Sequence, residues 1–300
     1  FFDRAIAILN FSVLLRLADP NLRKFSNAWL RLGIKLARKS CSPIARGWAR
    51  HCMYVWRIQQ GRPFLSLRHA RAALQWYWRD PKDLFWESQF LASSLIGPYW
   101  HTGQLKRMRA EALGLRARAD EQKHGMTQYF CHVGASQWSD LVVDDVAGGR
   151  KSIAKVRTSI GSQSFQSPRF FLWHSEVMQL IYEGRATKAR ELILRHWKEL
   201  ENSYIFSTKH YHWFALWLRM CCNLVCLREQ TLGKSIVVND ALYCARRVGK
   251  LKQRAFVAYR DAYRLVLDEH LGRAASPAYW DAAIHRLDCV SHHLTANALR

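Results

Sequence analysis

The chain has 300 residues, of which 49% are hydrophobic, and it carries a formal net charge of +23 at pH 7. Its 13 Trp and 14 Phe residues supply enough bulk for a hydrophobic core, which excludes an intrinsically disordered chain. Only 7 Pro and 15 Gly occur among abundant Leu, Ala and Arg, and strand-type alternation is scarce. The composition therefore favours an all-α fold.

The amino-terminal residues, FFDRAIAILNFSVLL, lack an initiator Met, and no small-residue cleavage site follows the apolar run from Ala5 to Leu15. We therefore expect the chain to be a piece of a longer protein. The longest run without a charged residue, Ser88 to Leu105, contains Gln, Gly, Pro and His and is too polar to cross a bilayer. The sequence predicts no membrane span and a soluble protein.

The first third of the chain is predicted to contain helical hairpins. Residues 1–18 and 21–40 form the first, broken at Asp19-Pro20. In the next, Gly61 follows one helix and Pro63 opens another, which is the order expected of a helix end and a helix start. A further hairpin is expected to turn at Gly103.

A spacing of residue types recurs in the middle of the chain. The pattern W-x10-G-x4-A occurs twice, 35 residues apart, at Trp138, Gly149 and Ala154 and again at Trp173, Gly184 and Ala189. Each Gly is expected to end a helix with positive φ, each Ala to let the next helix approach closely, and each Trp to fill the space between hairpins. A period near 34 residues is typical of tetratricopeptide (TPR) repeats. We therefore predict an α-solenoid of TPR-like antiparallel helical hairpins.

The remainder of the chain is also predicted to be helical. Four helices are expected at about 205–228, 234–248, 252–271 and 277–297. We expect a single domain over residues 1–300. The Ser- and Gln-rich segment 159–169 is either a looser joint or an ordinary loop between repeats.

Eight cysteines fall within apolar helical runs, which predicts reduced, buried thiols and a cytoplasmic protein. Cys221, Cys222 and Cys226 raise the question of a metal site with His210 and His212. Two histidines that are two residues apart point to different sides of a helix, and no CxxC pair completes a set of four ligands. We therefore predict packing residues and no bound metal.

No convergent set of catalytic residues is found. The sequence has no G-x-S-x-G motif, and residues 148–151 and 232–235 lack the frame of a phosphate-binding P-loop. The adjacent acids Asp144-Asp145 and Asp268-Glu269 would point about 100° apart on a helix and are interpreted as surface residues. We predict no enzymatic activity and no cofactor for this segment.

The positive charge is uneven. Residues 1–80 hold 15 Lys/Arg against 3 Asp/Glu, residues 81–150 hold 8 against 8, and residues 151–300 hold 23 against 12. The first third is thus a candidate electropositive face for an acidic protein, a nucleic acid or a membrane surface. Aromatic and basic residues interleave in WARHCMYVWR, as in single-stranded RNA binders. The alternative is a solvated helix face, with the rings buried between hairpins.

The segments QWSDLVVDDVAGGRKSIAKV and FFLWHSEVMQLIYEGRATKARELILRHW, with the aromatic-rich helix at 204–227, carry a resemblance to a known family. Residues 124–228 resemble the TPR-like helical repeats that lie carboxy-terminal to the catalytic domain in large bacterial, eukaryotic-like serine/threonine protein kinases. Residues 41–120 look like degenerate members of the same series. The usual Gly and Tyr of the first repeat helix are replaced, at Val142 or Val177 and at Asp145 or Leu180.

The resemblance implies a cytoplasmic surface for protein–protein interaction in signal transduction. Its ligand would be a protein or peptide, plausibly acidic, or another domain of the same chain. ATP and Mg²⁺ would be bound by a kinase domain outside these residues, because they contain no H-R-D or D-F-G motif. We therefore expect a scaffold or regulatory region, with a basic RNA-binding repeat as the alternative.

Overall fold

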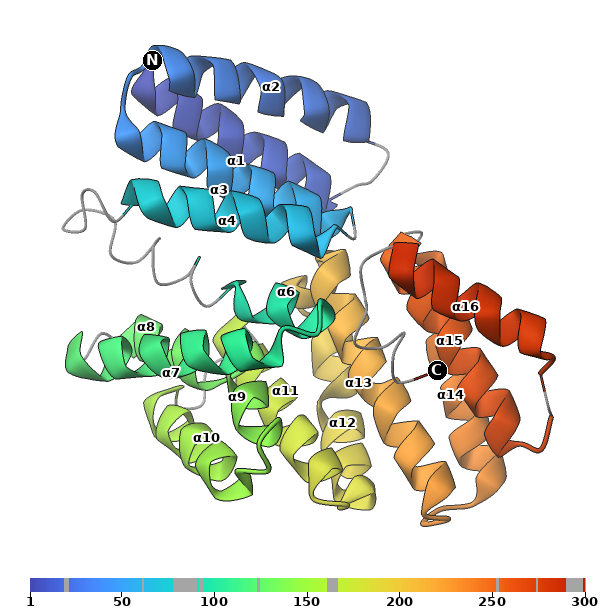
Figure 1. The fold of residues 1–300 in the computed structure, drawn as a ribbon. Helices are drawn as coiled ribbons and strands as arrows, with labels where there is room; N and C mark the ends of the chain where they lie inside the picture. Colours follow the sequence, from blue (N-terminus) through green and yellow to red (C-terminus); the bar gives the residue numbers. More distant parts are fainter. Residues whose placement is uncertain are drawn as a thin grey trace. The chain divides into compact units, whose positions relative to one another are not determined.

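The structure is a computed structural model that describes residues 1–18, 22–60, 62–77, 91, 94–122, 125–160, 167–251, 254–273, 275–289 and 299. These residues are mainly helical and contain no strand, which confirms the predicted all-α class. They group into two compact units, residues 1–122 (unit 1) and 123–300 (unit 2) (Figure 1). The sequence predicted one domain over residues 1–300, with segment 159–169 as either a looser joint or an ordinary loop between repeats. The boundary between the two units follows residue 122, and residues 161–166 of that segment lie outside the described residues.

Unit 1 is built from helices that pack on their neighbours along the chain (Figure 1). Its described helices are α1 (Phe2–Ala18), α2 (Arg23–Lys39), α3 (Pro43–Gln59), α4 (Pro63–Tyr77), α6 (Ile96–His101) and α7 (Leu105–Gln122). The predicted break at Asp19-Pro20 and the predicted turn residue Gly61 lie outside the described residues.

Local sequence explains how α3 begins and how closely it packs. The Ser42 side chain accepts a hydrogen bond from the Ala45 amide at 3.3 Å, and Pro43 occupies the first turn, where its missing N–H costs nothing. A Cβ atom on Gly47 would lie 2.5 Å from the Tyr77 ring. The absence of a side chain at residue 47 therefore lets α3 and α4 pack at short distance.

Unit 2 continues the same style of packing. Its described elements are α8 (Gly125–His132), α9 (Ala135–Leu141), α10 (Val146–Ile160), α11 (Ser167–Tyr182), α12 (Ala186–Glu201), the short 3-10 helix η2 (Tyr204–Ser207), α13 (Lys209–Arg228), α14 (Lys234–Lys250), α15 (Arg254–His270) and α16 (Pro277–Cys289). The last four match the helices expected near the end of the chain, although residues 290–297 of the final prediction lie outside the described residues.

Five described helices, α6, α9, α11, α13 and α15, end in the same turn. In each, one residue has φ between +52° and +73°, and the amide of the following residue bonds to the carbonyl five residues earlier at 2.9–3.3 Å. This is the Schellman arrangement, which satisfies carbonyls that the helix end leaves free. The turn residues are Gly103, Asp144, Gly184, Gln230 and Gly272.

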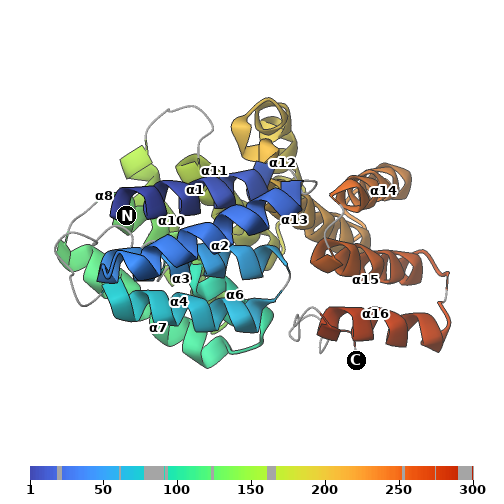
Figure 2. The same cartoon turned by 90° about the horizontal axis from the view of Figure 1, so that it is seen from above.

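Each of these turns joins two helices that contact one another: α6 and α7, α9 and α10, α11 and α12, α13 and α14, and α15 and α16. Within unit 2, helices of successive pairs also contact one another, and Figure 2 shows α14, α15 and α16 in a row. Successive turn residues are 40 to 46 residues apart. The spacing of 35 residues that the sequence suggested is therefore not the spacing of the turns.

Candidate functional site

The structure places three of the six predicted repeat positions as expected. Gly184 ends α11 with φ +70°, Ala189 is fully buried in α12, and the Trp173 ring is buried in α11. Trp138 is buried as well, but it lies in α9 six residues before the turn at Asp144, whereas Trp173 lies eleven residues before the turn at Gly184. The two tryptophans therefore do not hold equivalent places in their helical pairs.

The roles predicted for Gly149 and Ala154 require correction. Gly149 lies inside α10 and ends no helix, and Ala154 is exposed on α10. Gly149 follows the turn residue Asp144 by five positions, as Ala189 follows Gly184. A Cβ atom on Gly149 would lie 2.5 Å from Gln179 Oε1, so Gly149 permits the close approach that the sequence assigned to Ala154.

The residues that replace the expected glycine are Asp144 and Asp145. Asp144 takes the left-handed conformation with φ +60°, which Asp tolerates better than most residues. Asp145 Oδ1 accepts a hydrogen bond from the Gly148 amide at 2.8 Å and so caps the start of α10. Both residues are exposed, as the sequence predicted, but their roles in the turn and in the helix cap were not predicted. Asp is common at both kinds of position, so its presence here was the available signal.

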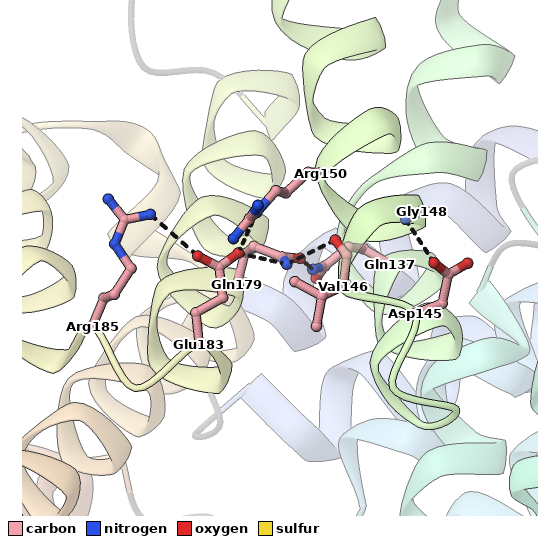
Figure 3. Close-up of polar contacts among 8 residues, drawn as sticks. All are labelled: Gln137, Asp145, Val146, Gly148, Arg150, Gln179, Glu183 and Arg185. Atoms are coloured by element: carbon pink, nitrogen blue, oxygen red, sulfur yellow. Dashed lines mark hydrogen bonds and ion pairs between the residues drawn. The ribbon is translucent and has the colours of Figure 1, made fainter.

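A polar network joins the α9–α10 pair to the α11–α12 pair (Figure 3). Gln137 Nε2 donates to Gln179 Oε1 at 2.6 Å, and Gln179 Nε2 donates to the Val146 carbonyl at 3.2 Å and to Glu183 Oε1 at 2.9 Å. Gln137 and Gln179 are both buried. We call these contacts, with those of Glu183 described next, the inter-pair network.

Glu183 is the charged centre of the inter-pair network. Figure 3 shows it between Arg150 and Arg185, whose nitrogens lie 2.7 Å and 3.1 Å from its carboxylate oxygens. The hydrogen bond from Arg150, helped by those from Gln179 and Arg185, lowers the pKa of Glu183 from its ordinary value to about 2. Glu183 is therefore anionic at neutral pH and unsuited to act there as a general base.

Two exposed contacts extend this junction along α10 and α11. Arg157 donates through Nε and Nη2 to Glu176 Oε1, at 3.0 and 2.7 Å. The Tyr182 hydroxyl donates to Asp144 Oδ1 at 3.0 Å, and this bond raises the pKa of Tyr182. Polar contacts thus fix the register between two helical pairs over several helical turns.

A second polar cluster lies where α12, α13 and α14 meet. Asp240 accepts hydrogen bonds from Arg219 through Nε and Nη2 and from Asn223 Nδ2, and the Arg219 and Asp240 side chains are only 10% and 8% exposed. The Arg219 guanidinium also lies over the rings of Trp197 and Tyr243, at 4.3 and 5.2 Å from their centroids. Arg219 and Asp240 therefore form a buried ion pair whose guanidinium also makes cation–π contacts.

His174 is buried among aromatic rings. It stacks on Trp217 at 6.2 Å and lies 5.7 Å from the ring centres of both Trp138 and Phe214. Neither of its ring nitrogens has a hydrogen-bond partner within the described part of the chain. Burial lowers the pKa of His174 to about 3, so the ring is neutral at physiological pH.

His210 and His212, which raised the metal question together with three cysteines of α13, pack against aromatic rings. His212 stacks on Phe206 at 4.3 Å, whereas His210 meets the edge of Phe214 at 4.6 Å. All eight cysteines are free thiols. Among the residues that the structure describes, no three His, Cys, Asp or Glu side chains are grouped so that they could hold a metal ion.

One substitution tests the turn that defines these pairs. Replacing Gly184 with Ala is expected to destabilise the protein by about 1 to 2 kcal/mol, because φ of +70° brings a Cβ atom close to the carbonyl oxygen. The matched control is Gly114→Ala in the interior of α7, where the new Cβ meets nothing within 4 Å and a gain of about 1 kcal/mol is expected. Urea unfolding measures both changes, and equal effects at the two positions would contradict the assignment of the turn.

The clusters described here are structural junctions between helices, and none of them combines a nucleophile with a general base. Within the described ranges, no helix has both the length and the apolar character needed to span a membrane. A scan against protein-family models finds no match for the chain, and searches of curated proteins and of solved structures find no significant relative.

Proposed function

We propose that this chain is a helical-repeat scaffold for protein–protein interaction within a larger cytoplasmic signalling protein. The observation that carries the proposal is the recurrence of one turn at Gly103, Asp144, Gly184, Gln230 and Gly272, each joining two packed helices. Repeated helical pairs expose side chains of many helices on a continuous surface, which is how such proteins bind other chains.

The repeat spacing refines the family expectation. Turns 40 to 46 residues apart exceed the period of about 34 residues of TPR repeats and fall near the range of about 40–47 residues of longer two-helix repeats. We therefore propose that each repeat resembles a TPR repeat in being a helix-turn-helix unit, but that it is longer than a TPR repeat. By resemblance to the repeats of large serine/threonine kinases, its role would be substrate recruitment or autoregulation beside a catalytic domain outside these residues.

Two further observations support a binding role over a catalytic one. The inter-pair network and the Arg219–Asp240 pair hold successive helices in fixed register, which suits a preorganised binding surface. The pKa values of Glu183 and His174 are lowered to about 2 and about 3, far from those of groups that exchange protons at neutral pH. Free thiols fit a reducing compartment such as the cytoplasm.

Cross-linking in cells followed by reconstitution tests the scaffold proposal. Cross-linked peptides should identify a protein partner, and the purified partner should bind the 300-residue chain with defined stoichiometry in isothermal titration calorimetry. The complex should survive nuclease treatment. A purified chain that converts a substrate at a rate abolished by a single side-chain substitution, and that gives no saturable protein complex, would overturn the proposal.

The alternative is a nucleic-acid-binding repeat, and α2 supplies the observation in its favour. Five of its Lys and Arg side chains are exposed, and the helix contains no acidic residue. If this is the function, affinity for single-stranded RNA should fall about 100-fold between about 50 and 200 mM salt, because contacts with five side-chain cations release bound cations of the nucleic acid. Fluorescence anisotropy measures this slope, and no binding at about 50 mM salt removes the alternative.

A further inference from the structure

The outer face of the first helical pair exposes large apolar side chains. Phe11 and Leu14 on α1 are 48% and 62% exposed, and Phe25 and Leu32 on α2 are 65% and 42% exposed. Each pair is spaced so that both side chains lie on one side of their helix. Figure 2 shows α1 and α2 side by side at the end of unit 1, and we call these four residues the α1–α2 apolar face.

The two apolar stripes adjoin one another. The ring of Phe11 meets the edge of Trp29 on α2, with 5.7 Å between the ring centres and an interplanar angle of 89°. On the opposite side of the same helices, Leu9 and Leu30 are buried in the core of unit 1. The exposed apolar residues are therefore additional to those that the fold of unit 1 requires.

A row of positive charge borders the α1–α2 apolar face. The spacing of residues 24, 31, 35 and 38 places their side chains along one strip of α2, next to the strip that holds Phe25 and Leu32. The only carboxylate within α1 and α2 is Asp3, in the first turn of α1. The exposed basic residues of this row are Lys24, Arg31, Lys35 and Arg38, and Lys39, also exposed, follows them at the end of α2.

From this juxtaposition we infer that the α1–α2 face binds an anionic membrane surface. Exposed Phe and Leu beside a row of Lys and Arg is the pattern of helices that lie in the lipid headgroup layer, with the apolar side chains in the acyl boundary and the cations at the anionic headgroups. The attachment is peripheral. It goes beyond the scaffold proposal, because it uses none of the contacts between the helical pairs of unit 2.

The charge and exposure of this face favour a membrane over other occupants. A second copy of the chain would bring the same uncompensated cations against each other, which opposes association. A nucleic acid would match the cations but would leave four large apolar side chains without a partner. Side chains that are 42–65% exposed also protrude from the surface, which fits insertion between headgroups better than receipt of a partner helix into a groove.

Sedimentation with vesicles tests this inference on the full chain. The chain should bind vesicles of phosphatidylcholine with about 30% phosphatidylserine and should bind pure phosphatidylcholine vesicles at least about tenfold more weakly. Phe25→Ser/Leu32→Ser should weaken binding about tenfold or more, because the inserted apolar surface is lost. Lys35→Gln/Arg38→Gln/Lys39→Gln should weaken it about 100-fold, at about fivefold for each charge.

Matched controls come from unit 2. Ile236→Ser/Tyr279→Ser removes apolar side chains of similar exposure, 57% and 65%, and Lys188→Gln/Arg195→Gln/Lys198→Gln removes three exposed cations from α12. Both controls should bind as the wild type does, and circular dichroism should show equal helix content in all variants. No binding to the anionic vesicles at low salt would overturn the inference. So would equal losses in the control variants, or RNA binding that depends on the three α2 cations while vesicle binding does not.

Discussion

Replacement of Asp240 by Ala is expected to destabilise the protein by about 3 to 5 kcal/mol. The Arg219 guanidinium is only 10% exposed and would lose its carboxylate partner. Its charge would stay buried, so the desolvation penalty would no longer be offset by the ion pair. Asn223 would lose an acceptor as well. Urea unfolding followed by tryptophan fluorescence measures the change directly, since Trp197 and Trp213 are both buried in this core.

Two further variants separate a buried ion pair from an ordinary surface contact. Asp268→Ala removes an exposed carboxylate that lies 3.9 Å from Arg273, and it should cost no more than about 1 kcal/mol. The double variant Arg219→Met/Asp240→Leu should recover part of the stability lost in Asp240→Ala, because it removes the buried Arg219 charge. Arg190, 17% exposed and 3.9 Å from Asp240, still loses this carboxylate in both variants. If Asp240→Ala costs no more than Asp268→Ala, the account of this cluster is wrong.

Acidification is expected to destabilise the protein through His174, and His174→Phe should reduce this sensitivity. Burial lowers the pKa of His174 from 6.5 to about 3. Between these two pH values, the His174 ring is protonated in the unfolded chain but stays neutral in the folded chain, so acid favours the unfolded state. The stability that the neutral ring supports is thus complete above about pH 6.5 and is lost as pH falls toward 3. Between pH 7.5 and 4.5, the wild type should lose about 2 to 3 kcal/mol more than the variant.

The comparison with His174→Phe isolates one histidine among several. Burial also lowers the pKa values of His51, His210 and His212 to about 4, so the wild type and the variant both lose stability in acid. Phe keeps the ring among Trp138, Phe214 and Trp217 and removes the titrating nitrogens. His285→Gln, on the exposed side of α16, serves as the control. Parallel pH profiles for the wild type and His174→Phe would contradict the assignment.

Much of the local structure was predictable because it depends on neighbouring residues. Gly103 and Gly184 mark turns because glycine adopts positive φ without strain, and Ser42 and Pro63 mark helix starts for reasons that a short segment contains. The all-α class followed from the same local preferences.

The features that the sequence did not predict depend on tertiary contacts. Asp144 and Gln230 adopt positive φ without being glycines, because the helices on either side of each turn pack together and hold it in place. The contact between Gln137 and Gln179 joins residues 42 positions apart, and no spacing rule connects them. The 35-residue pattern consists of Trp, Gly and Ala, whereas the turn between α9 and α10 is made by Asp144.

The same reasoning explains why the candidate site differs from the predicted one. The six predicted positions lie in or next to the junction between the α9–α10 and α11–α12 pairs, but the polar residues that hold this junction together were not among them. Gln, Glu and Arg are common on helix surfaces, so their identity alone does not indicate burial. Only the packing of α10 against α11 distinguishes Gln179 and Glu183 from solvated side chains.

An experimental structure of the 300-residue chain, at a resolution that defines backbone dihedral angles, tests most directly whether one kind of turn closes the repeated helical pairs. We expect φ near +70° at Gly184, near +60° at Asp144 and near +52° at Gln230, with the next amide bonded to the carbonyl five residues earlier. An unbroken helix through residues 140–150 or 226–236, or turns that recur every 35 residues with Gly149 at a helix end, would contradict this expectation.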